Sequence, residues 1–289
     1  MLSHSFFPLF DKYIYNLVTT IEDIRLSTLS VLRDFANDGV VYLELRTTPR
    51  SIPDAGVTKE TYVSSVLDTI DAFNAQQDKI KTYLILSIDR RNNTDQADEV
   101  VDLALRYTDK GVLGVDLCGN PLCGDVSIFQ PAFARAKAGG LNIALHFGEV
   151  PTSGTKEELQ TLLSYGPQRL GHVICVPEEI KSEVLRKRLA LELCLSCNVL
   201  AKLSMGGFAD HHFGEWRKTN CPIALSTDDV GIFESSLSNE YFLAAQHFDL
   251  TYSELVVLSY SAVNAIFGGE QEKRRLRRLL ITFGNTIPG

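Results

Sequence analysis

The sequence predicts an α/β fold, a TIM-type (β/α)8 barrel of parallel strands, and three observations lead to this expectation. Strand-like apolar runs alternate with segments long enough for helices, which implies right-handed crossovers and a parallel sheet. Most runs are apolar on one face and polar or small on the other. The length of 289 residues is close to that of a single barrel domain, here expected to span 1–289.

Seven strand candidates follow one another along the chain. They are 40–47, 82–89, 112–118, 141–147, 169–174, 189–196 and 221–228. An open doubly wound sheet would be apolar on both faces of its central strands. Six of the seven candidates are instead apolar on one face only, and 169–174 does not divide cleanly. This pattern favours a closed barrel, although such a barrel has eight strands and one is missing here.

The candidate at 141–147 illustrates the two faces. Leu145 and Phe147 share the apolar face, whereas Ala144 and His146 share the other, because residues two apart point the same way. The apolar face is expected to pack on outer helices, and the other face to line the barrel interior.

Helix signals occupy the segments between and beside these strands. Helices are expected at 6–18 and 21–37 before the first strand, and two or three more after the last. Thr155 precedes Glu158 by three residues, and Thr251 precedes Glu254 by three, so both pairs fit a capping box.

The composition excludes several partners. A net charge of −8 and a pI near 5.3 argue against nucleic acid or an anionic membrane as the main partner. No run approaches the roughly 18 apolar residues of a membrane span. The first residues lack the basic region of a signal peptide, so the six cysteines are expected to be reduced thiols in a cytoplasmic protein.

Four of the apolar runs end in residues able to bind a metal or move a proton: His146, His172, Cys194 and Asp228. Imidazole and carboxylate are ordinary ligands of catalytic zinc, so His146 and Asp228 are candidate ligands. Glu149 follows His146 by three residues and can act as acid or base, while His172 can position a metal-bound water. One such residue alone would be as readily explained by burial or capping. Several such residues at the same end of consecutive strands predict a catalytic metal site.

The order of these residues resembles the adenosine deaminase family: His146 with Glu149, then Gly171-His172, then Asp228-Asp229. Further stretches make the match narrower, to the adenosine deaminase-like branch that acts on N6-methyl-AMP. These stretches are Leu45–Arg50, Ile88–Arg91, Gly114–Pro121 and His211–Gly214. The resemblance extends from about residue 8 to the carboxyl terminus and implies a barrel of the metal-dependent hydrolase type.

The resemblance implies a zinc enzyme with one ion per chain. His146 and Asp228 would be zinc ligands. Glu149 would protonate the purine ring nitrogen beside the attacked carbon, and His172 would orient and polarise the zinc-bound water. Zinc lowers the pKa of such a water from 15.7 to about 7. The implied reaction is hydrolytic deamination of N6-methyl-AMP, and of related 6-substituted purine nucleotides, to IMP with release of methylamine.

The resemblance also implies the residues that bind the substrate. Asp229 would hydrogen-bond the imidazole side of the purine, and the backbone N–H of Gly119 would hold the ring nitrogen on the opposite edge. The end that receives the 5′-phosphate would be lined by Thr47, Thr48, Pro49, Arg50 and Asp89. An arginine suits that end, because the paired N–H donors of its planar guanidinium group match the geometry of phosphate oxygens. The only partner expected is this small nucleotide, with the protein a monomer.

One part of the family pattern is not found. The family carries a His-x-His pair on its first strand, which supplies two more zinc ligands, and no His-x-His occurs in this sequence. The segment 40–47 matches the family's second strand, so the missing eighth strand and the missing ligands are expected to be one absence and the zinc site incomplete. Tyr15 also stands where relatives often have histidine, and Cys197 where serine usually precedes Asn198.

Alternative interpretations remain open. One alternative is a catalytically impaired fragment or pseudoenzyme that at most binds a purine nucleotide, and another is a deaminase of the nucleoside adenosine. A third class is a metal-dependent barrel hydrolase that opens cyclic amides. That class commonly uses a carboxylated lysine, and no inner-face strand position is lysine. Cys194 and Cys197 are not expected to pair, because residues three apart on a strand face opposite sides. No role follows for His211 and His212.

Overall fold

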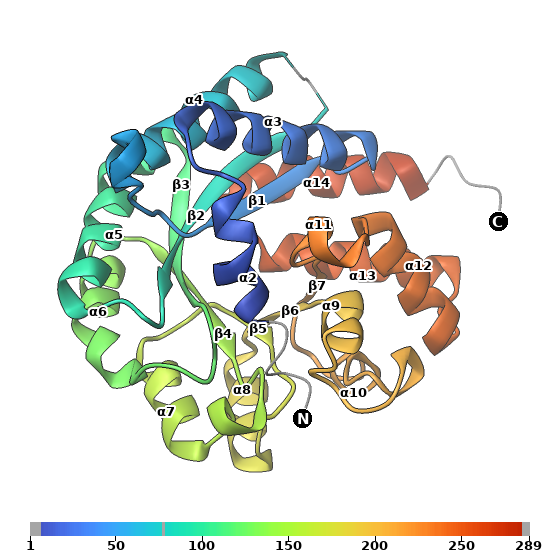
Figure 1. The fold of residues 1–289 in the computed structure, drawn as a ribbon. Helices are drawn as coiled ribbons and strands as arrows, with labels where there is room; N and C mark the ends of the chain where they lie inside the picture. The colour runs from blue at the N-terminus through green and yellow to red at the C-terminus, as the bar shows by residue number, and fades with distance from the viewer. Residues whose placement is uncertain (1–6, 77–78, 285–289) are drawn as a thin grey trace. The chain divides into compact units, whose positions relative to one another are not determined.

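The computed structural model describes residues 7–76 and 79–284, so the expected helix at 6–18 begins just outside the described residues. The chain forms two compact units, Met1–Ile143 and Ala144–Gly289. Each unit contains parallel strands that alternate with helices (Figure 1).

The first unit holds three parallel strands and their connecting helices. Its elements are α2 (Pro8–Lys12), η1 (Ile14–Asn16), α3 (Ile21–Asn37), β1 (Tyr42–Thr47), α4 (Lys59–Gln76), β2 (Lys81–Asp89), α5 (Thr94–Arg106), β3 (Val112–Cys118) and α6 (Gln130–Ala138). Strand β2 pairs with β1 and with β3, and Asp89 lies opposite Cys118 in the second pairing. The carboxyl ends of β2 and β3 therefore lie side by side.

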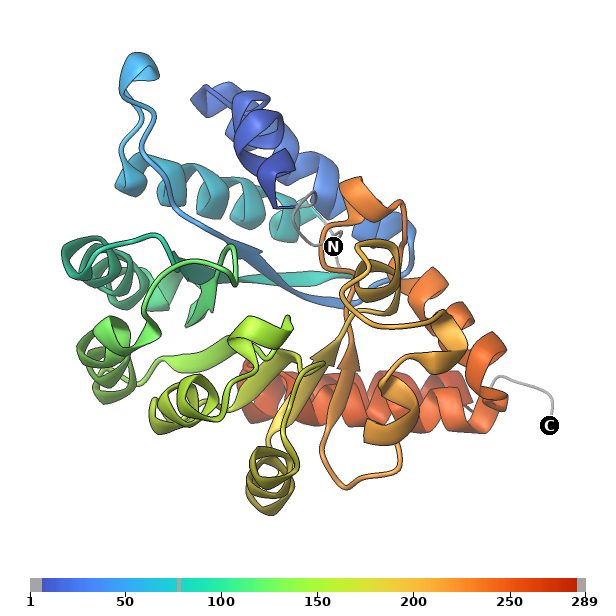
Figure 2. The ribbon, with the colours of Figure 1, turned by 60° about the horizontal axis from the view of Figure 1, so that its bottom comes forward.

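The second unit begins inside β4 and holds the remaining strands. Its elements are β4 (Asn142–Phe147), α7 (Lys156–Ser164), β5 (Arg169–His172), α8 (Glu178–Lys187), β6 (Ala190–Leu193), α9 (Leu195–Leu200), α10 (Phe213–Trp216), β7 (Ile223–Leu225), α11 (Val230–Phe233), α12 (Leu237–Phe248), α13 (Tyr252–Ala265) and α14 (Gly269–Gly284). Helices α7 and α8, which connect β4 to β5 and β5 to β6, lie on the same side of these strands (Figure 2).

The strand register of the second unit brings its carboxyl ends to one edge. All three pairings, β4 with β5, β5 with β6 and β6 with β7, are parallel. Phe147 lies opposite His172, and Leu193 lies opposite Leu225. Residues that follow these positions by one to three places therefore share the edge at which the strands end.

Burial agrees with the expected apolar faces. Leu84, Leu86 and Ile88 of β2 have no exposed surface, and Ile143 and Phe147 of β4 have none either. The opposite face is polar in places: the Ser87 hydroxyl donates to the buried Asp116 carboxylate over 3.2 Å, and Arg46 Nε lies 3.4 Å from the same carboxylate. The predicted two-faced strands are thus present, as are seven strands within the described residues.

Several predicted boundaries differ from the structure. The segment 6–18 is not one helix, because Tyr13 leaves the helical conformation (φ −129°, ψ −58°) between α2 and the 3-10 turn η1. The predictions 169–174 and 221–228 are longer than β5 and β7, whereas 112–118 matches β3. Up to residue 284, where the described structure ends, four helices follow β7 instead of two or three, since α11 adds a single turn.

The predicted strand 189–196 ends early for a reason that lies far along the chain. Strand β6 ends at Leu193, and α9 begins at Leu195. The buried Glu240 carboxylate accepts the backbone N–H of Leu195 over 2.8 Å and that of Ser196 over 3.2 Å. A carboxylate at this position stabilises the start of a helix, because the first N–H groups of a helix have no internal partner.

The two predicted capping boxes differ in the structure. Thr155 accepts the N–H of Glu158 at the start of α7, which is one half of its predicted box, and at Thr251 both halves are present. Within the described part of the chain, no helix is both long and apolar enough to cross a membrane.

Candidate functional site

The second unit collects polar side chains where its strands end. His146 lies near the end of β4, and His172 is the last residue of β5. The centroids of the two imidazole rings lie 5.2 Å apart, and the ring planes are tilted by 51°. His172 Nε2 lies 3.8 Å from Glu149 Oε1 and 3.9 Å from Asp228 Oδ2. The structure thus brings four of the predicted residues into one group.

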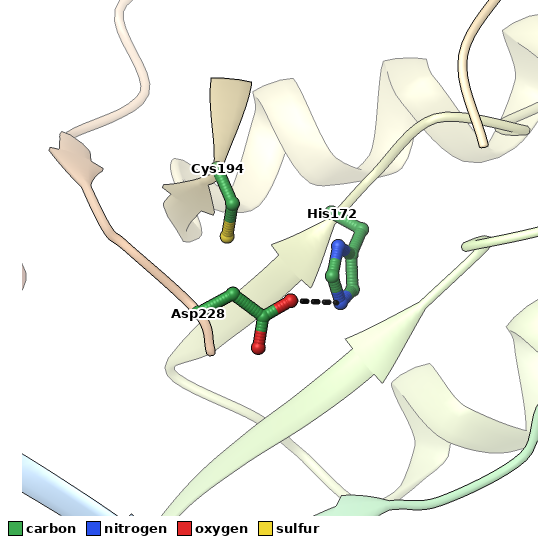
Figure 3. Close-up of side chains that lie close together, drawn as sticks. All are labelled: His172, Cys194 and Asp228. Carbon is green, nitrogen blue, oxygen red and sulfur yellow. Dashed lines mark ion pairs between the residues drawn. The ribbon is translucent and has the colours of Figure 1, made fainter. Parts of the chain in front are cut away.

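Cys194 joins this group from the end of β6. The ligand atoms of His172, Cys194 and Asp228 all lie within 4.8 Å of one another. Figure 3 shows the three side chains pointing toward a common centre from three different strand ends. Nitrogen, sulfur and carboxylate oxygen are the ligand types that Zn²⁺ takes in proteins, so this donor set fits a zinc ion. The sequence placed Cys194 at a strand end but assigned it no role.

Cys197 contacts a predicted metal ligand. Because α9 begins at Leu195, Cys197 lies on a helix, and the strand geometry assumed for Cys194 and Cys197 was wrong. The Cys197 thiol donates to Asp228 Oδ2 over 2.9 Å. Burial, and then the charge of Asp228, hold the pKa of this thiol well above its usual range. The thiol therefore keeps its proton at neutral pH and orients the carboxylate.

The backbone is strained at the same place. His172, Val173 and Asp228 have positive φ angles of 63°, 48° and 53°. Left-handed conformations cost non-glycine residues about 1–2 kcal/mol each and persist where the surroundings hold them. This strain lies at two of the predicted site residues, and no sequence pattern signals it.

Asp229 is the fifth predicted residue of this edge. Burial, together with the charge of neighbouring Asp228, raises the pKa of Asp229 to about 7. Near neutral pH this carboxyl can therefore hold a proton or release it, which suits a group that contacts a polar heterocycle.

The first unit carries the residues predicted for the phosphate end. Thr47 Oγ1 lies 2.9 Å from the Tyr62 hydroxyl, and Thr48 Oγ1 lies 3.3 Å from Cys118 Sγ. Pro49 is buried. Thr47 is the last residue of β1, and Thr48 to Arg50 follow its carboxyl end.

Gly119 and Asp89 are in close contact within the first unit. Gly119 has a φ of +97°, and a Cβ added there would lie 2.7 Å from Asp89 Oδ1. Asp89 is itself bound by Arg91, whose backbone N–H, Nε and Nη2 donate to its carboxylate over 2.8, 2.9 and 2.7 Å. Glycine is required at 119 because it brings its backbone against this ion pair.

Arg50 and Arg91 share one aromatic ring. Their guanidinium carbons lie 5.2 and 5.7 Å from the ring centroid of Tyr15. Arg50 Nη1 also donates to the Tyr15 carbonyl over 2.8 Å, and Nη2 donates to the Val18 carbonyl. Arg91 was not among the predicted site residues, although its motif was noted. Two arginines and one aspartate leave this group with a net positive charge, which favours an anion.

His211 is buried and His212 is half-buried in the second unit, and their pKa values predict acid sensitivity. Burial lowers the pKa of His211 to about 2 and that of His212 to about 4, against 6.5 for a free side chain. The unfolded chain therefore binds protons that the folded chain does not as the pH falls below about 6.5, so the free energy of unfolding falls too. We expect each histidine to remove about 2–3 kcal/mol of stability by about pH 4.5.

Urea unfolding at about pH 7.5 and about pH 4.5 measures this effect. His211→Gln should reduce the loss of stability between the two pH values, whereas His247→Gln, a change on the half-exposed face of α12, should not. An equal loss in the wild type and in His211→Gln would contradict the expectation.

The fold and the site define a class of protein. Parallel strands whose carboxyl ends carry imidazole, thiol and carboxylate groups are typical of metal-dependent hydrolases built on a TIM-type barrel.

Comparison with known proteins narrows this class. The model of the adenosine deaminase family matches residues 3–283. N6-mAMP deaminase of Arabidopsis thaliana is 39% identical over 94% of this chain and 81% of its own length, and N6-methyl-AMP deaminase of Homo sapiens is 38% identical over 92% and 76%. The structure of Arabidopsis ADAL complexed with IMP has a TM-score of 0.92 at 38% identity, covering 97% of this chain and 83% of that one. The chain therefore belongs to the adenosine deaminase family, and the predicted fold class and enzyme class, a hydrolytic deaminase, are confirmed.

Proposed function

We propose that this chain is a zinc-dependent purine aminohydrolase that converts N6-methyl-AMP, and related 6-substituted purine nucleotides, to IMP. The observation that carries the proposal is the group formed by His146, Glu149, His172 and Asp228 at the strand ends of the second unit. The names of the similar enzymes support the substrate, and the IMP complex of Arabidopsis ADAL supports the product.

His146 and Asp228 are the proposed zinc ligands of this chain. Both come from strand ends, and Cys197 orients the Asp228 carboxylate. When bound, zinc supplies a water whose pKa is lowered to about 7. His172, which lies between Glu149 and Asp228, is proposed to orient that water toward the substrate.

Glu149 is the proposed proton donor. Only 5% of its surface is exposed, so a proton on its carboxyl is shielded from bulk water. Protonation of the purine ring nitrogen beside the attacked carbon makes that carbon electrophilic. Water adds there, the methylamino group takes up a proton and leaves as methylamine, and the 6-oxo purine remains.

The nucleotide is proposed to be recognised by the remaining predicted residues. Asp229 forms a hydrogen bond with the imidazole side of the purine, and the Gly119 N–H donates a hydrogen bond to a ring nitrogen on the other edge. The phosphate is bound by the positively charged group of the first unit, with Thr47, Thr48, Pro49, Arg50 and Asp89 as its predicted members. Arg91 adds a second guanidinium to this group.

Thr48→Val tests whether the substrate phosphate is recognised by the positively charged group of the first unit. Valine keeps the shape of threonine but removes its hydroxyl, and a hydrogen bond to a charged group contributes about 1.5–3 kcal/mol. We expect kcat/KM for N6-methyl-AMP to fall by about 10- to 100-fold. The value for N6-methyladenosine, which has no phosphate, should change little. An equal fall for both substrates would contradict the phosphate assignment and favour a nucleoside enzyme.

One observation favours a second candidate function. No His-x-His occurs in the 289 residues, so the proposed site has two of the usual protein ligands of zinc. On this alternative the chain binds a purine nucleotide without turning it over. Stoichiometric zinc in the purified chain, together with turnover that Glu149→Gln abolishes, would exclude it.

A further inference from the structure

Two buried side chains, Asn198 and His211, connect the His172 ring to the main chain through a continuous series of hydrogen bonds. Asn198 Oδ1 lies 3.0 Å from His172 Nδ1, and Asn198 Nδ2 lies 3.0 Å from His211 Nε2. The backbone N–H of Phe213 donates to His211 Nδ1 over 3.0 Å. The exposed fractions are 3% for His172, 0% for Asn198 and 2% for His211, so protein groups supply these hydrogen bonds.

The direction of these bonds follows from His211. Its Nδ1 accepts a hydrogen bond from the backbone N–H of Phe213, a group that can only donate. Burial lowers the pKa of His211 to about 2, so the ring is neutral and carries its single proton on Nε2. That Nε2–H needs an acceptor, yet the amide as oriented presents its NH₂ group. An imidazole with two accepting nitrogens would have no proton at all.

A half turn of the Asn198 amide about its terminal torsion resolves the conflict. The oxygen and nitrogen of an amide have nearly the same shape, so the hydrogen-bond network decides which end faces which partner. After the turn the amide oxygen accepts from His211 Nε2–H, and the NH₂ group donates to His172 Nδ1. His172 Nδ1 is then an acceptor, so the ring proton of His172 lies on Nε2.

We propose that His211 and Asn198 are positioning residues that fix the tautomer of His172, with its proton on the nitrogen that faces Glu149 and Asp228. The Phe213 N–H fixes the tautomer of His211, and His211 fixes the orientation of the Asn198 amide. Asn198 in turn fixes the tautomer of His172. In this form His172 donates a hydrogen bond into the site through Nε2 and accepts none there. The functional consequence rests on the proposed deaminase activity. In this tautomer His172 orients the attacking water by donating a hydrogen bond to its oxygen, and is not the base that removes the proton of that water.

His212 supports the same residue through the backbone. His212 Nε2 lies 2.6 Å from the carbonyl oxygen of His172, and only an N–H can donate to that oxygen. Trp216 Nε1–H donates to the carbonyl of Val173 over 3.3 Å. These bonds hold the two consecutive left-handed residues, His172 and Val173. The segment from His211 to Trp216 therefore fixes both the main chain and the ring of His172, a role that sequence analysis did not assign.

Nitrogen-15 NMR of the imidazole rings tests the tautomer directly. The chain has six histidines, so His172 and His211 can be assigned with single His→Gln variants. Protonated and unprotonated ring nitrogens differ widely in chemical shift, and the experiment needs neither zinc nor turnover. We expect both His172 and His211 to be protonated on Nε2 and unprotonated on Nδ1. A wild-type His172 protonated on Nδ1 would overturn the proposal, whether or not the chain is a deaminase.

Asn198→Asp reverses the hydrogen bond between residue 198 and His172, while the side chain at 198 keeps its shape. A carboxylate accepts from both neighbours, so His172 should move its proton to Nδ1. We expect kcat for N6-methyl-AMP to fall by about 10- to 100-fold, as for other partners that orient a metal-site residue, while KM changes little. Asn264→Asp, the same change at an exposed position of α13, is the control and should alter neither the His172 shifts nor kcat. A His172 proton on Nδ1 with unchanged kcat would overturn the functional part of the proposal.

Discussion

Replacing Glu149 with glutamine is expected to lower kcat for N6-methyl-AMP by about 10²- to 10⁴-fold, the usual contribution of a positioned acid or base. Glutamine has nearly the same size and keeps an oxygen near His172 Nε2, which lies 3.8 Å from the Glu149 carboxylate. It has no acidic proton to give to the purine ring. The loss should therefore appear in kcat, because substrate and zinc can still bind.

The measurement is IMP formation under saturating nucleotide, with zinc in excess. Glu157→Gln, a change of the same kind in the exposed first turn of α7, should leave turnover unchanged. A Glu149→Gln variant that retains more than about a tenth of wild-type kcat would show that another group donates the proton.

Replacing Asp228 with asparagine is expected to abolish both zinc binding and turnover. The amide oxygen still accepts the Cys197 thiol bond, which in the wild type spans 2.9 Å, so the local structure should persist. The negative charge that attracts the cation is lost. Loss of an orienting partner alone costs about 10- to 100-fold in metal affinity, and loss of a ligand should cost more.

Zinc titration of the metal-free chain, followed by an assay of the same samples, measures both effects. Asp249→Asn is the matched control. Asp249 is exposed beyond the end of α12 and has a φ of 51°, a conformation that asparagine tolerates well. Unchanged zinc affinity in Asp228→Asn would contradict the assignment of Asp228 as a ligand and direct attention to His172 and Cys194, which lie beside it.

The strands, and the metal-binding or proton-transferring residues at their carboxyl ends, were predictable from local sequence patterns. Alternation of apolar and polar residues located the strands, because the two faces of a strand meet different surroundings. The parallel order then implied that His146, His172 and Asp228 share one edge, and the second unit has this arrangement. Assigning roles to Glu149, Gly119 or Asp229 depended on the family resemblance, because no spacing rule specifies a purine.

The features that were not predictable depend on partners distant in sequence. The start of α9 depends on Glu240, which lies 45 residues beyond Leu195. Cys197 was placed on a strand for that reason, and its bond to Asp228 was missed. Arg91 and His211 were noted only within motifs, since their roles arise from contacts with Asp89 and Asn198 that form on folding. The left-handed backbone at His172 has no local sequence signal either.

The most direct test of the proposed chemistry is product analysis on the zinc-loaded chain. Purified protein with zinc in excess is incubated with N6-methyl-AMP, and bound zinc, IMP and methylamine are quantified in the same sample. We expect about one zinc per chain and equal amounts of IMP and methylamine, with turnover lost in Glu149→Gln. A chain that binds zinc and nucleotide but releases neither product would contradict it.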